Sequence, residues 1–342
     1  MLIGLSRMAT CALLLALGLT TARPVFAQEI NLYTTREPGL MKPLMDGFTK
    51  ATGIKVNSIF IKDGLTERVA AEGAQSPADV LMTVDIGNLI DVVEKGLAQP
   101  VRSPVLEKAI PANLRGKDNQ WFTLSTRARV LYASKDLKLT SFTYEELADP
   151  KWKGKICIRA GQHPYNTAMI AAYLAKHGEP QTEAWLRGIK ANLARKATGG
   201  DRDVARDIVG GICDIGIGNS YYVGLMRSGS GGAEQKKWGD GIDVVLPKFA
   251  GGGTLVNISG AAIAKHSPHR AEAQRFLEYL VSDEGQKIYA EMNYEHPVKA
   301  GAPIHPIMAA LGPLNVDPLS LTEIARLRAT ASKLVDKVGF DQ

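Results

Sequence analysis

The spacing of apolar and polar residues predicts strands and helices that alternate along the chain. Runs in which apolar residues alternate with polar ones, or follow one another without a break, predict strands at residues 29–33, 54–60 and 77–84. Apolar residues then recur at helical spacing in the intervening stretches, which predicts helices at residues 39–50, 65–72 and 87–95. Regular strand–helix alternation is typical of α/β proteins with a parallel sheet.

A second unit with the same alternation follows the first. Its predicted strands lie at residues 121–132, 155–159, 211–219, 244–247 and 255–264. Its predicted helices lie at residues 144–149, 166–177, 182–193, 201–209, 270–281 and 321–338. Two α/β units, with late segments available to return to the first, predict a two-lobed, hinged binding protein.

The first 27 residues have the pattern of an export signal. Arg7 supplies positive charge, residues 11–19 are an apolar core, and Val25-Phe26-Ala27 is a small-x-small cleavage site. The core is shorter than the ~20 residues that cross a bilayer. We therefore expect residues 1–27 to be removed and the rest to be a soluble periplasmic protein that does not span the membrane. A buried N-terminal helix is the alternative interpretation.

Composition and motifs narrow the function classes. The net charge of +6 comes from 41 basic and 35 acidic side chains that are dispersed rather than gathered in a tract. This balance suits an anionic ligand, but the absence of a basic patch interleaved with aromatic residues argues against nucleic-acid binding. The sequence also lacks the Gly-x-Ser-x-Gly, P-loop and His-Glu-x-x-His patterns, so we do not predict an enzyme.

Two cysteines lie beyond the expected signal, and both are in strand-like runs. These are Cys157 and Cys213. An oxidising compartment permits a disulfide between them, which we favour. Two buried free thiols are the alternative, because the sequence does not give the distance between the two Cα atoms.

The most informative chemistry is carried by tyrosines that follow predicted strands. Tyr221 and Tyr222 come directly after the glycine-rich run at 211–219, and Tyr165 follows the strand at 155–159. Adjacent side chains point to opposite faces of a strand and lie about 100° apart on a helix, so the pair is poorly placed for a core. One ligand site at a strand end explains both hydroxyls.

Phenol oxygens suit a particular class of metal ion. A phenol has a pKa of about 10, so it becomes a strong ligand only when something displaces its proton. A small, hard trication does so, and hard oxygen ligands match hard cations. The tyrosines therefore predict a ferric-ion site whose affinity falls with acid, because binding releases phenolic protons.

The chain resembles the periplasmic ferric-ion-binding proteins of ABC-type iron uptake, the bacterial transferrins, over essentially all of residues 28–342. The resemblance is carried by the segments 31–36, 76–80, 126–130, 199–202, 218–222 and 257–260. It implies a type II periplasmic binding protein in which each lobe is a mixed sheet flanked by helices. It also implies an N-lobe at residues 28–127, completed by about 250–298, and a C-lobe at 128–249, completed by about 299–342.

The resemblance is greatest to the branch that binds iron through three tyrosines. It implies that Tyr165, Tyr221 and Tyr222 are the ferric ligands. It implies a synergistic anion such as carbonate, an inner-membrane ABC permease as partner, and a monomeric carrier.

Further residues are candidates for the anion and the metal. The resemblance places Arg36 on the anion, and Arg127 or Arg129 are additional anion-binding candidates on one predicted strand face. Many members have a His or His-Tyr pair soon after the first strand, where this chain has Glu37-Pro38. Glu37 is therefore an open possibility for a fourth protein ligand, and so is His163, which lies close to Tyr165 in the sequence.

Two other functions are weighed against ferric binding. The first is a binding protein for a small oxyanion or phosphonate without metal, which would use Arg36, Arg127 and helix N-termini. The second is a periplasmic enzyme on the same fold.

Overall fold

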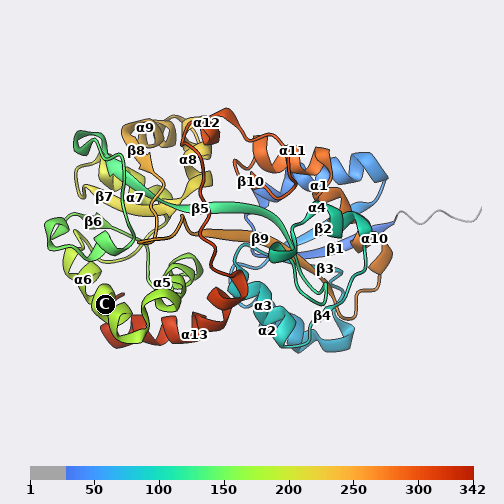
Figure 1. Cartoon of the computed structure of the whole chain (residues 1–342). Helices are drawn as coiled ribbons and strands as arrows, with labels where there is room; N and C mark the ends of the chain where they lie inside the picture. The colour runs from blue at the N-terminus through green and yellow to red at the C-terminus, as the bar shows by residue number, and fades with distance from the viewer. Residues whose placement is uncertain (1–27) are drawn as a thin grey trace, which may run out of the picture.

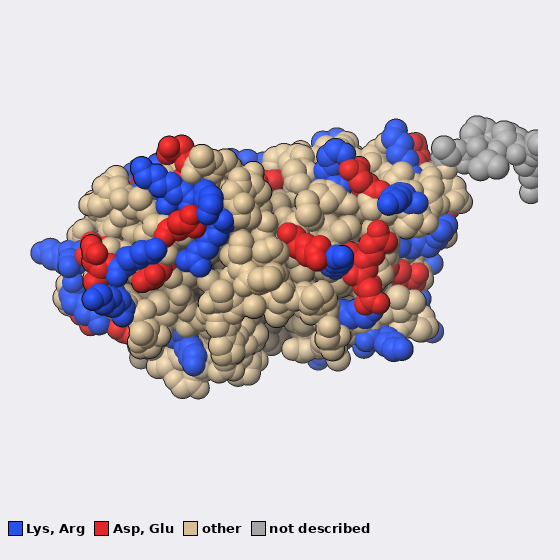
Figure 2. Space-filling model, turned by 90° about the horizontal axis from the view of Figure 1, so that it is seen from above, with Lys and Arg blue, Asp and Glu red and all other residues tan. Residues whose placement is uncertain are grey.

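The computed structural model describes residues 28–342 and shows an elongated molecule with two lobes (Figure 1). The expected export signal at residues 1–27 lies outside the described residues. Within the described part of the chain, no helix is both long enough and apolar enough to cross a membrane. Basic and acidic side chains are interspersed over both lobes on the face seen in Figure 2.

One lobe, on the right in Figure 1, is built first from the N-terminal third of the chain. Its elements are β1 (Glu29–Thr34), α1 (Pro38–Thr52), β2 (Lys55–Phe60), α2 (Leu65–Glu72), β3 (Val80–Thr83), α3 (Ile86–Glu94), β4 (Ala98–Gln99) and α4 (Pro104–Ala109). The chain later returns to this lobe through β9 (Val256–Ala264), α10 (Arg270–Leu280), α11 (Asp283–Glu291) and β10 (His296–Pro297).

The other lobe holds the middle of the chain. Its elements are β6 (Ile156–Cys157), α5 (Pro164–His177), α6 (Glu179–Asn192), α7 (Asp201–Val209), β7 (Ile215–Asn219), α8 (Ser220–Arg227), α9 (Ala233–Gly241), β8 (Ile242–Val245) and α12 (Pro306–Ala309). The last helix, α13 (Leu321–Val338), packs against α5 of this lobe and also against α3 of the first lobe.

A single ten-stranded sheet runs through both lobes. Its order is β2-β1-β3-β9-β5-β7-β6, with β8 and β10 beside β5 and β4 beside β9. Both lobes combine parallel and antiparallel pairs. In the first lobe β1 is parallel to β3, which is antiparallel to β9. In the second lobe β6 is parallel to β7, which is antiparallel to β5. Mixed sheets flanked by helices confirm the fold class expected from the sequence.

The long strand β5 (Phe122–Ser134) connects the lobes. Residues 122–128 of β5 pair with β9, and residues 129–133 pair with β7. One continuous strand therefore belongs to the sheet of the first lobe and then to the sheet of the second.

Several short helices were not predicted from the sequence. These are α4, α8, α9, α11 and α12. The omission of α8 matters most, because residues 220–222 were expected to follow a strand but not to begin a helix. In the structure α8 begins immediately after β7 and has eight residues. Because the helix is short and follows a glycine-rich strand without a separating turn, its apolar residues do not show a recognisable helical spacing in the sequence.

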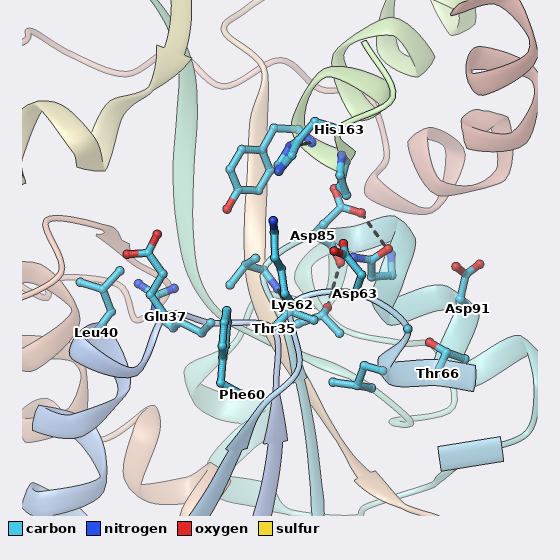
Figure 3. A pocket seen from close by; sticks show the side chains of 18 of the residues that line it. Thr35, Glu37, Leu40, Phe60, Lys62, Asp63, Thr66, Asp85, Asp91 and His163 are labelled. Carbon is cyan, nitrogen blue, oxygen red and sulfur yellow. Dashed lines mark hydrogen bonds between the residues drawn. The ribbon is translucent and has the colours of Figure 1, made fainter. Parts of the chain in front are cut away.

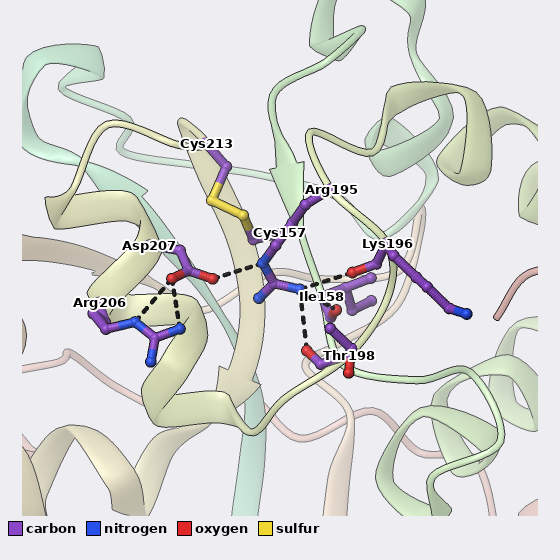
Figure 4. The surroundings of a disulfide bond; sticks show 8 residues. All are labelled: Cys157, Ile158, Arg195, Lys196, Thr198, Arg206, Asp207 and Cys213. Carbon is purple, nitrogen blue, oxygen red and sulfur yellow. Dashed lines mark hydrogen bonds and ion pairs between the residues drawn. A yellow bond between two sulfur atoms is a disulfide. The ribbon is translucent and has the colours of Figure 1, made fainter. Parts of the chain in front are cut away.

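Cys157 and Cys213 are joined in a disulfide that spans 56 residues, with Cα atoms 5.8 Å apart (Figure 4). Cys157 lies in β6, and Cys213 precedes β7 by two residues. Nearby, the Asp207 carboxylate accepts a hydrogen bond of 2.6 Å from Nε of Arg195. These links fix the start of the strand that leads into α8.

The end of β7 is also fixed by close packing at a glycine. Gly218 lies opposite Val130 of β5, and a Cβ atom at Gly218 would stand 2.2 Å from the ring of Tyr132. The Tyr132 hydroxyl in turn donates a hydrogen bond of 2.8 Å to the carbonyl of Asn219. No larger side chain fits here without displacing Tyr132.

We predict that Gly218→Ala lowers the free energy of unfolding by roughly 1–3 kcal/mol, the usual cost of overpacking a close contact. Urea denaturation followed by circular dichroism measures the change. Gly39→Ala is the matched control, because Gly39 is in α1 and an added Cβ there would meet no neighbouring atom within 4 Å. That control should be neutral or slightly stabilising, since alanine favours helices. Equal stability of both variants would contradict the packing argument.

Candidate functional site

A cavity of about 380 Å³ lies between the lobes (Figure 3). The first lobe contributes the segments after β1, β2 and β3, which are the carboxyl ends of neighbouring parallel strands. The second lobe contributes the beginnings of α5 and α8. The polar and aromatic side chains that give the cavity its chemistry include Arg36, Glu37, Arg127, Arg159, His163, Tyr165, Tyr221, Tyr222 and Glu295.

The three tyrosines predicted as ligands all line this cavity. Tyr165 is in the first turn of α5, after Pro164, and Tyr221 and Tyr222 are in the first turn of α8. Each therefore follows a strand, as expected, but it belongs to a helix that starts within the site, which was not expected for Tyr221 and Tyr222. A helix start carries free N–H groups and partial positive charge, which favours anionic groups nearby.

Although Tyr221 and Tyr222 are consecutive residues of a helix, their rings lie side by side. Their ring centroids lie 4.1 Å apart with an interplanar angle of 33°. All three tyrosines are nearly buried, with exposed fractions of 8% for Tyr165, 4% for Tyr221 and 7% for Tyr222. One lobe thus presents three phenol groups to one cavity.

Burial raises the pKa of both Tyr221 and Tyr222 well above the usual value for a phenol, and the neighbouring Tyr165 adds to the shift in each. Asp201 raises the pKa of Tyr222 further. Both hydroxyls therefore keep their protons at neutral pH in the free protein. A ligand that binds phenolates here must displace those protons.

Cationic side chains surround the tyrosine rings. The guanidinium carbons of Arg159, Arg127 and Arg129 lie 5.0, 5.7 and 6.0 Å from the ring centroid of Tyr165. That of Arg202 lies 4.7 Å from the ring of Tyr222. Distances in this range allow cation–π attraction and make the region electropositive.

Arg129 is committed to a network inside the second lobe. Its Nη1 lies 2.7 Å from Oδ2 of Asp201, and its Nη2 donates to Oδ1 of Asn166 at 2.5 Å. Arg159 binds the other Asp201 oxygen at 3.1 Å, and the Asn219 N–H donates to Asp201 at 2.8 Å. Among the described residues that line the cavity, Arg159 is present and Arg129 is not.

Asp201 was not singled out from the sequence, although it holds this network together. Burial alone would raise its pKa, but Arg129 and Arg159 outweigh burial and lower it. The only sequence signal was its place in the 199–202 segment, at the start of a predicted helix.

Arg36 and Arg127, two of the anion-binding candidates, meet at a shared hydroxyl. Both Nη1 atoms donate to Ser259 Oγ, at 2.5 Å from Arg36 and 2.9 Å from Arg127. Arg36 also pairs with Glu295 at 3.1 Å. Burial opposes the charge of Arg36, yet Glu295 raises the pKa of this guanidinium, which stays charged. Glu295 is a second residue that sequence reasoning missed.

The two open ligand candidates have different surroundings. Glu37 lies at the N-terminus of α1 and reaches Arg202 of the other lobe at 3.4 Å. The His163 ring accepts the Tyr165 N–H through Nδ1 at 3.2 Å. Burial, reinforced by Arg159, lowers the pKa of His163 to about 3, so its ring is neutral. Within residues 28–342, no group of three or more His, Cys, Asp and Glu side chains could hold a metal.

The fold and the site agree with comparisons to known proteins. The sequence pattern of the bacterial extracellular solute-binding proteins matches residues 33–287. This chain belongs to that family, whose members are solute-binding proteins and not enzymes. Its relatives include ferric-binding proteins, as the resemblance predicted.

Three relatives illustrate the likeness. Iron uptake protein A2 of Synechocystis is 41% identical over 92% of this chain and 90% of its own length. The structure of a Bordetella ferric binding protein is 62% identical, covers 92% of this chain and 100% of its own, and has a TM-score of 0.84. A Trichodesmium protein solved with iron and citrate is 43% identical, covers 91% and 99%, and has a TM-score of 0.84.

We predict that Asp201→Asn lowers the free energy of unfolding by about 3–5 kcal/mol at pH 7, because Arg129 and Arg159 lose their buried counter-charge. The folded-state pKa of Asp201 is lowered, so its contribution is complete above the unfolded aspartate pKa of about 3.9. That contribution disappears as pH falls through the lower folded-state value.

Urea titrations at a series of pH values measure this effect. The difference between Asp201→Asn and the wild type should be constant from about pH 7 to pH 5 and should shrink only below about pH 4. Asp240→Asn is the control, because Asp240 makes an exposed pair with Lys236 and should change stability by less than about 0.5 kcal/mol. A difference that grows on acidification would contradict the account of Asp201.

Proposed function

We propose that this protein captures ferric iron in the cavity between its lobes and delivers it to an ABC permease in the inner membrane. The observation that carries the proposal is the convergence of Tyr165, Tyr221 and Tyr222 on one electropositive cavity. Three phenolates balance the charge of a trication, and their hard oxygens suit it. Relatives named as iron uptake and ferric-binding proteins support the same function.

The site also suits a small anion beside the metal. Nε and Nη2 of both Arg36 and Arg127 are buried and make no hydrogen bond within residues 28–342. Unpaired buried donors of this kind fit an oxyanion, which would complete the coordination sphere. We propose carbonate in this role, bound in its singly charged form, bicarbonate, with Arg36 and Arg127 as its partners. Citrate, found with iron in the Trichodesmium relative, is the second candidate.

The remaining features of a transport cycle are also proposed. Residues 1–27 would direct export to the periplasm, where the protein would act as a monomer. Closure would bring the N-lobe, residues 28–127 with about 250–298, onto the C-lobe, residues 128–249 with about 299–342. A hinge of this kind selects the closed form when ligand is bound.

Ferric loading should colour the protein through phenolate-to-iron charge transfer, and Tyr221→Phe should remove most of this absorbance. Loss of a direct ligand should weaken iron binding by more than the about 10–100-fold that is typical for loss of an outer partner. Visible spectra during titration with ferric citrate measure both effects. Tyr173→Phe is the control, since Tyr173 is buried against Trp185 and does not line the cavity.

A colourless protein under these conditions would contradict ferric binding. If that protein bound sulfate or a phosphonate in chelator-treated buffer, the metal-free oxyanion carrier would be the correct function instead.

Iron affinity should fall steeply with acid. Tyr221 and Tyr222 hold their protons at neutral pH, so iron must displace at least two protons on binding. The affinity should then drop by about 100-fold for each pH unit. Competition with a chelator of known proton affinity, measured from pH 8 to pH 6, tests this slope. A flat profile would exclude these two phenols as ligands.

A further inference from the structure

Glu295 lies at the centre of the contacts that hold Arg36 and Arg127. Its side chain is fully buried, with 0% exposure. One carboxylate oxygen lies 3.1 Å from Nη1 of Arg36 and 3.9 Å from Nη1 of Arg127. The other oxygen accepts a hydrogen bond from the Ser125 hydroxyl. A single carboxylate therefore contacts both cations.

The contacts engage the same end of each guanidinium group. Ser259 Oγ and Glu295 face Nη1 of Arg36 and Arg127, whereas Nε and Nη2 of both have no partner within residues 28–342. Nε and Nη2 form one edge of the planar guanidinium, and this edge binds two oxygens of a planar oxyanion. Holding Nη1 thus leaves the anion-binding edge of each arginine unused.

Glu295 also sets the local charge. Two guanidinium groups carry +2, and the carboxylate reduces the cluster to +1. The neighbouring Arg159 is already paired with Asp201. An anion at the cluster is attracted in proportion to its charge times that of the cluster, so lowering the cluster charge weakens a doubly charged anion more than a singly charged one.

The backbone around Glu295 is anchored on the helix that carries two of the tyrosines. Tyr294 has a φ of 57°, in the left-handed region, and is buried. A Cβ atom added to Gly224 of α8 would stand 2.3 Å from Tyr294. On the other side, His296 pairs with Thr126, next to Arg127. The position of Glu295 is therefore fixed from both α8 and β5.

We propose that Glu295 is a positioning residue for the anion: it holds Arg36 and Arg127 by their Nη1 ends and, by lowering their joint charge, favours bicarbonate over doubly charged oxyanions such as sulfate. This proposal rests on the anion site of the proposed function, and it adds a residue that sets which anion that site accepts.

The test measures anion binding to the metal-free, full-length mature protein by calorimetry, with bicarbonate and sulfate as probes at pH 8. Glu295→Gln keeps the shape and removes the charge, so the sulfate-to-bicarbonate affinity ratio should rise by roughly tenfold or more. Glu295→Asp keeps the charge and withdraws the carboxylate, so both affinities should fall with less change in their ratio.

The matched control is Glu183→Gln. Glu183 also contacts two cations, Arg187 at 2.7 Å and Lys337 at 2.6 Å, but it does not line the cavity. The Glu183→Gln variant should bind both anions with the same affinities as the wild type. Urea denaturation shows whether each variant is folded. If Glu295→Gln does not fold, Glu295→Asp and Ser125→Ala replace it in the test, and both should bind the two anions more weakly than the wild type does.

Two results would overturn the proposal. The first is an unchanged affinity ratio in Glu295→Gln together with unchanged affinities in Glu295→Asp. The second is a wild-type protein that binds neither anion without metal. Failure of the proposed function is separate, because it appears as a missing phenolate-to-iron band in the wild type whatever the anion results are.

Discussion

The constraint that shapes this structure is the burial of positively charged arginine side chains beside phenol groups. Arg36 and Arg127 at the cavity and Arg129 behind it are almost wholly buried, and the side chain of Arg159 is only 12% exposed. A guanidinium group does not lose its charge in a protein, so its desolvation must be offset by carboxylates or by a ligand. Two carboxylates face these four cations, and the remaining positive charge makes the cleft a receptor for anionic groups.

The two carboxylates organise the site in different ways. Asp201 binds Arg129 and Arg159 within one lobe and also accepts the N–H of Asn219, the residue before α8. This network gives rigidity to the helix start that bears the adjacent tyrosines. Glu295 instead pairs with Arg36 and lies near Arg127, and so it connects segments that are far apart in the chain. The phenol groups are thus preassembled in one lobe, while Arg36 and Glu37 approach from the other.

Much of the fold could be predicted from the sequence, because its strands and long helices have clear apolar periods. The helix from 65 to 72 and the last helix from 321 to 338 were placed at the bounds that the structure has. The helix α8 was missed because the glycines before it suggested a strand and its eight residues are too few to establish a period.

The site was only partly predictable for a different reason. Tyrosines and arginines stand out by residue type and by resemblance, but their carboxylate partners do not. Glu295 is 259 positions from Arg36, and Asp201 is 72 positions from Arg129. Only the tertiary fold brings these groups together, and residue type alone distinguishes neither acid from the other Asp and Glu residues of the chain. Residues whose role is to hold another side chain are therefore the hardest to recognise in a single sequence.

The shared strand β5 has a mechanical consequence. Ala128 pairs with β9 of one lobe, and the next residue, Arg129, pairs with β7 of the other. Arg127 and Arg129 stand on either side of this junction and belong to the two separate charge networks. If the lobes rotate as proposed, a twist of β5 near this peptide would alter the spacing of the two networks. Lobe opening and release of a bound ligand would then be coupled through the torsion of a single strand.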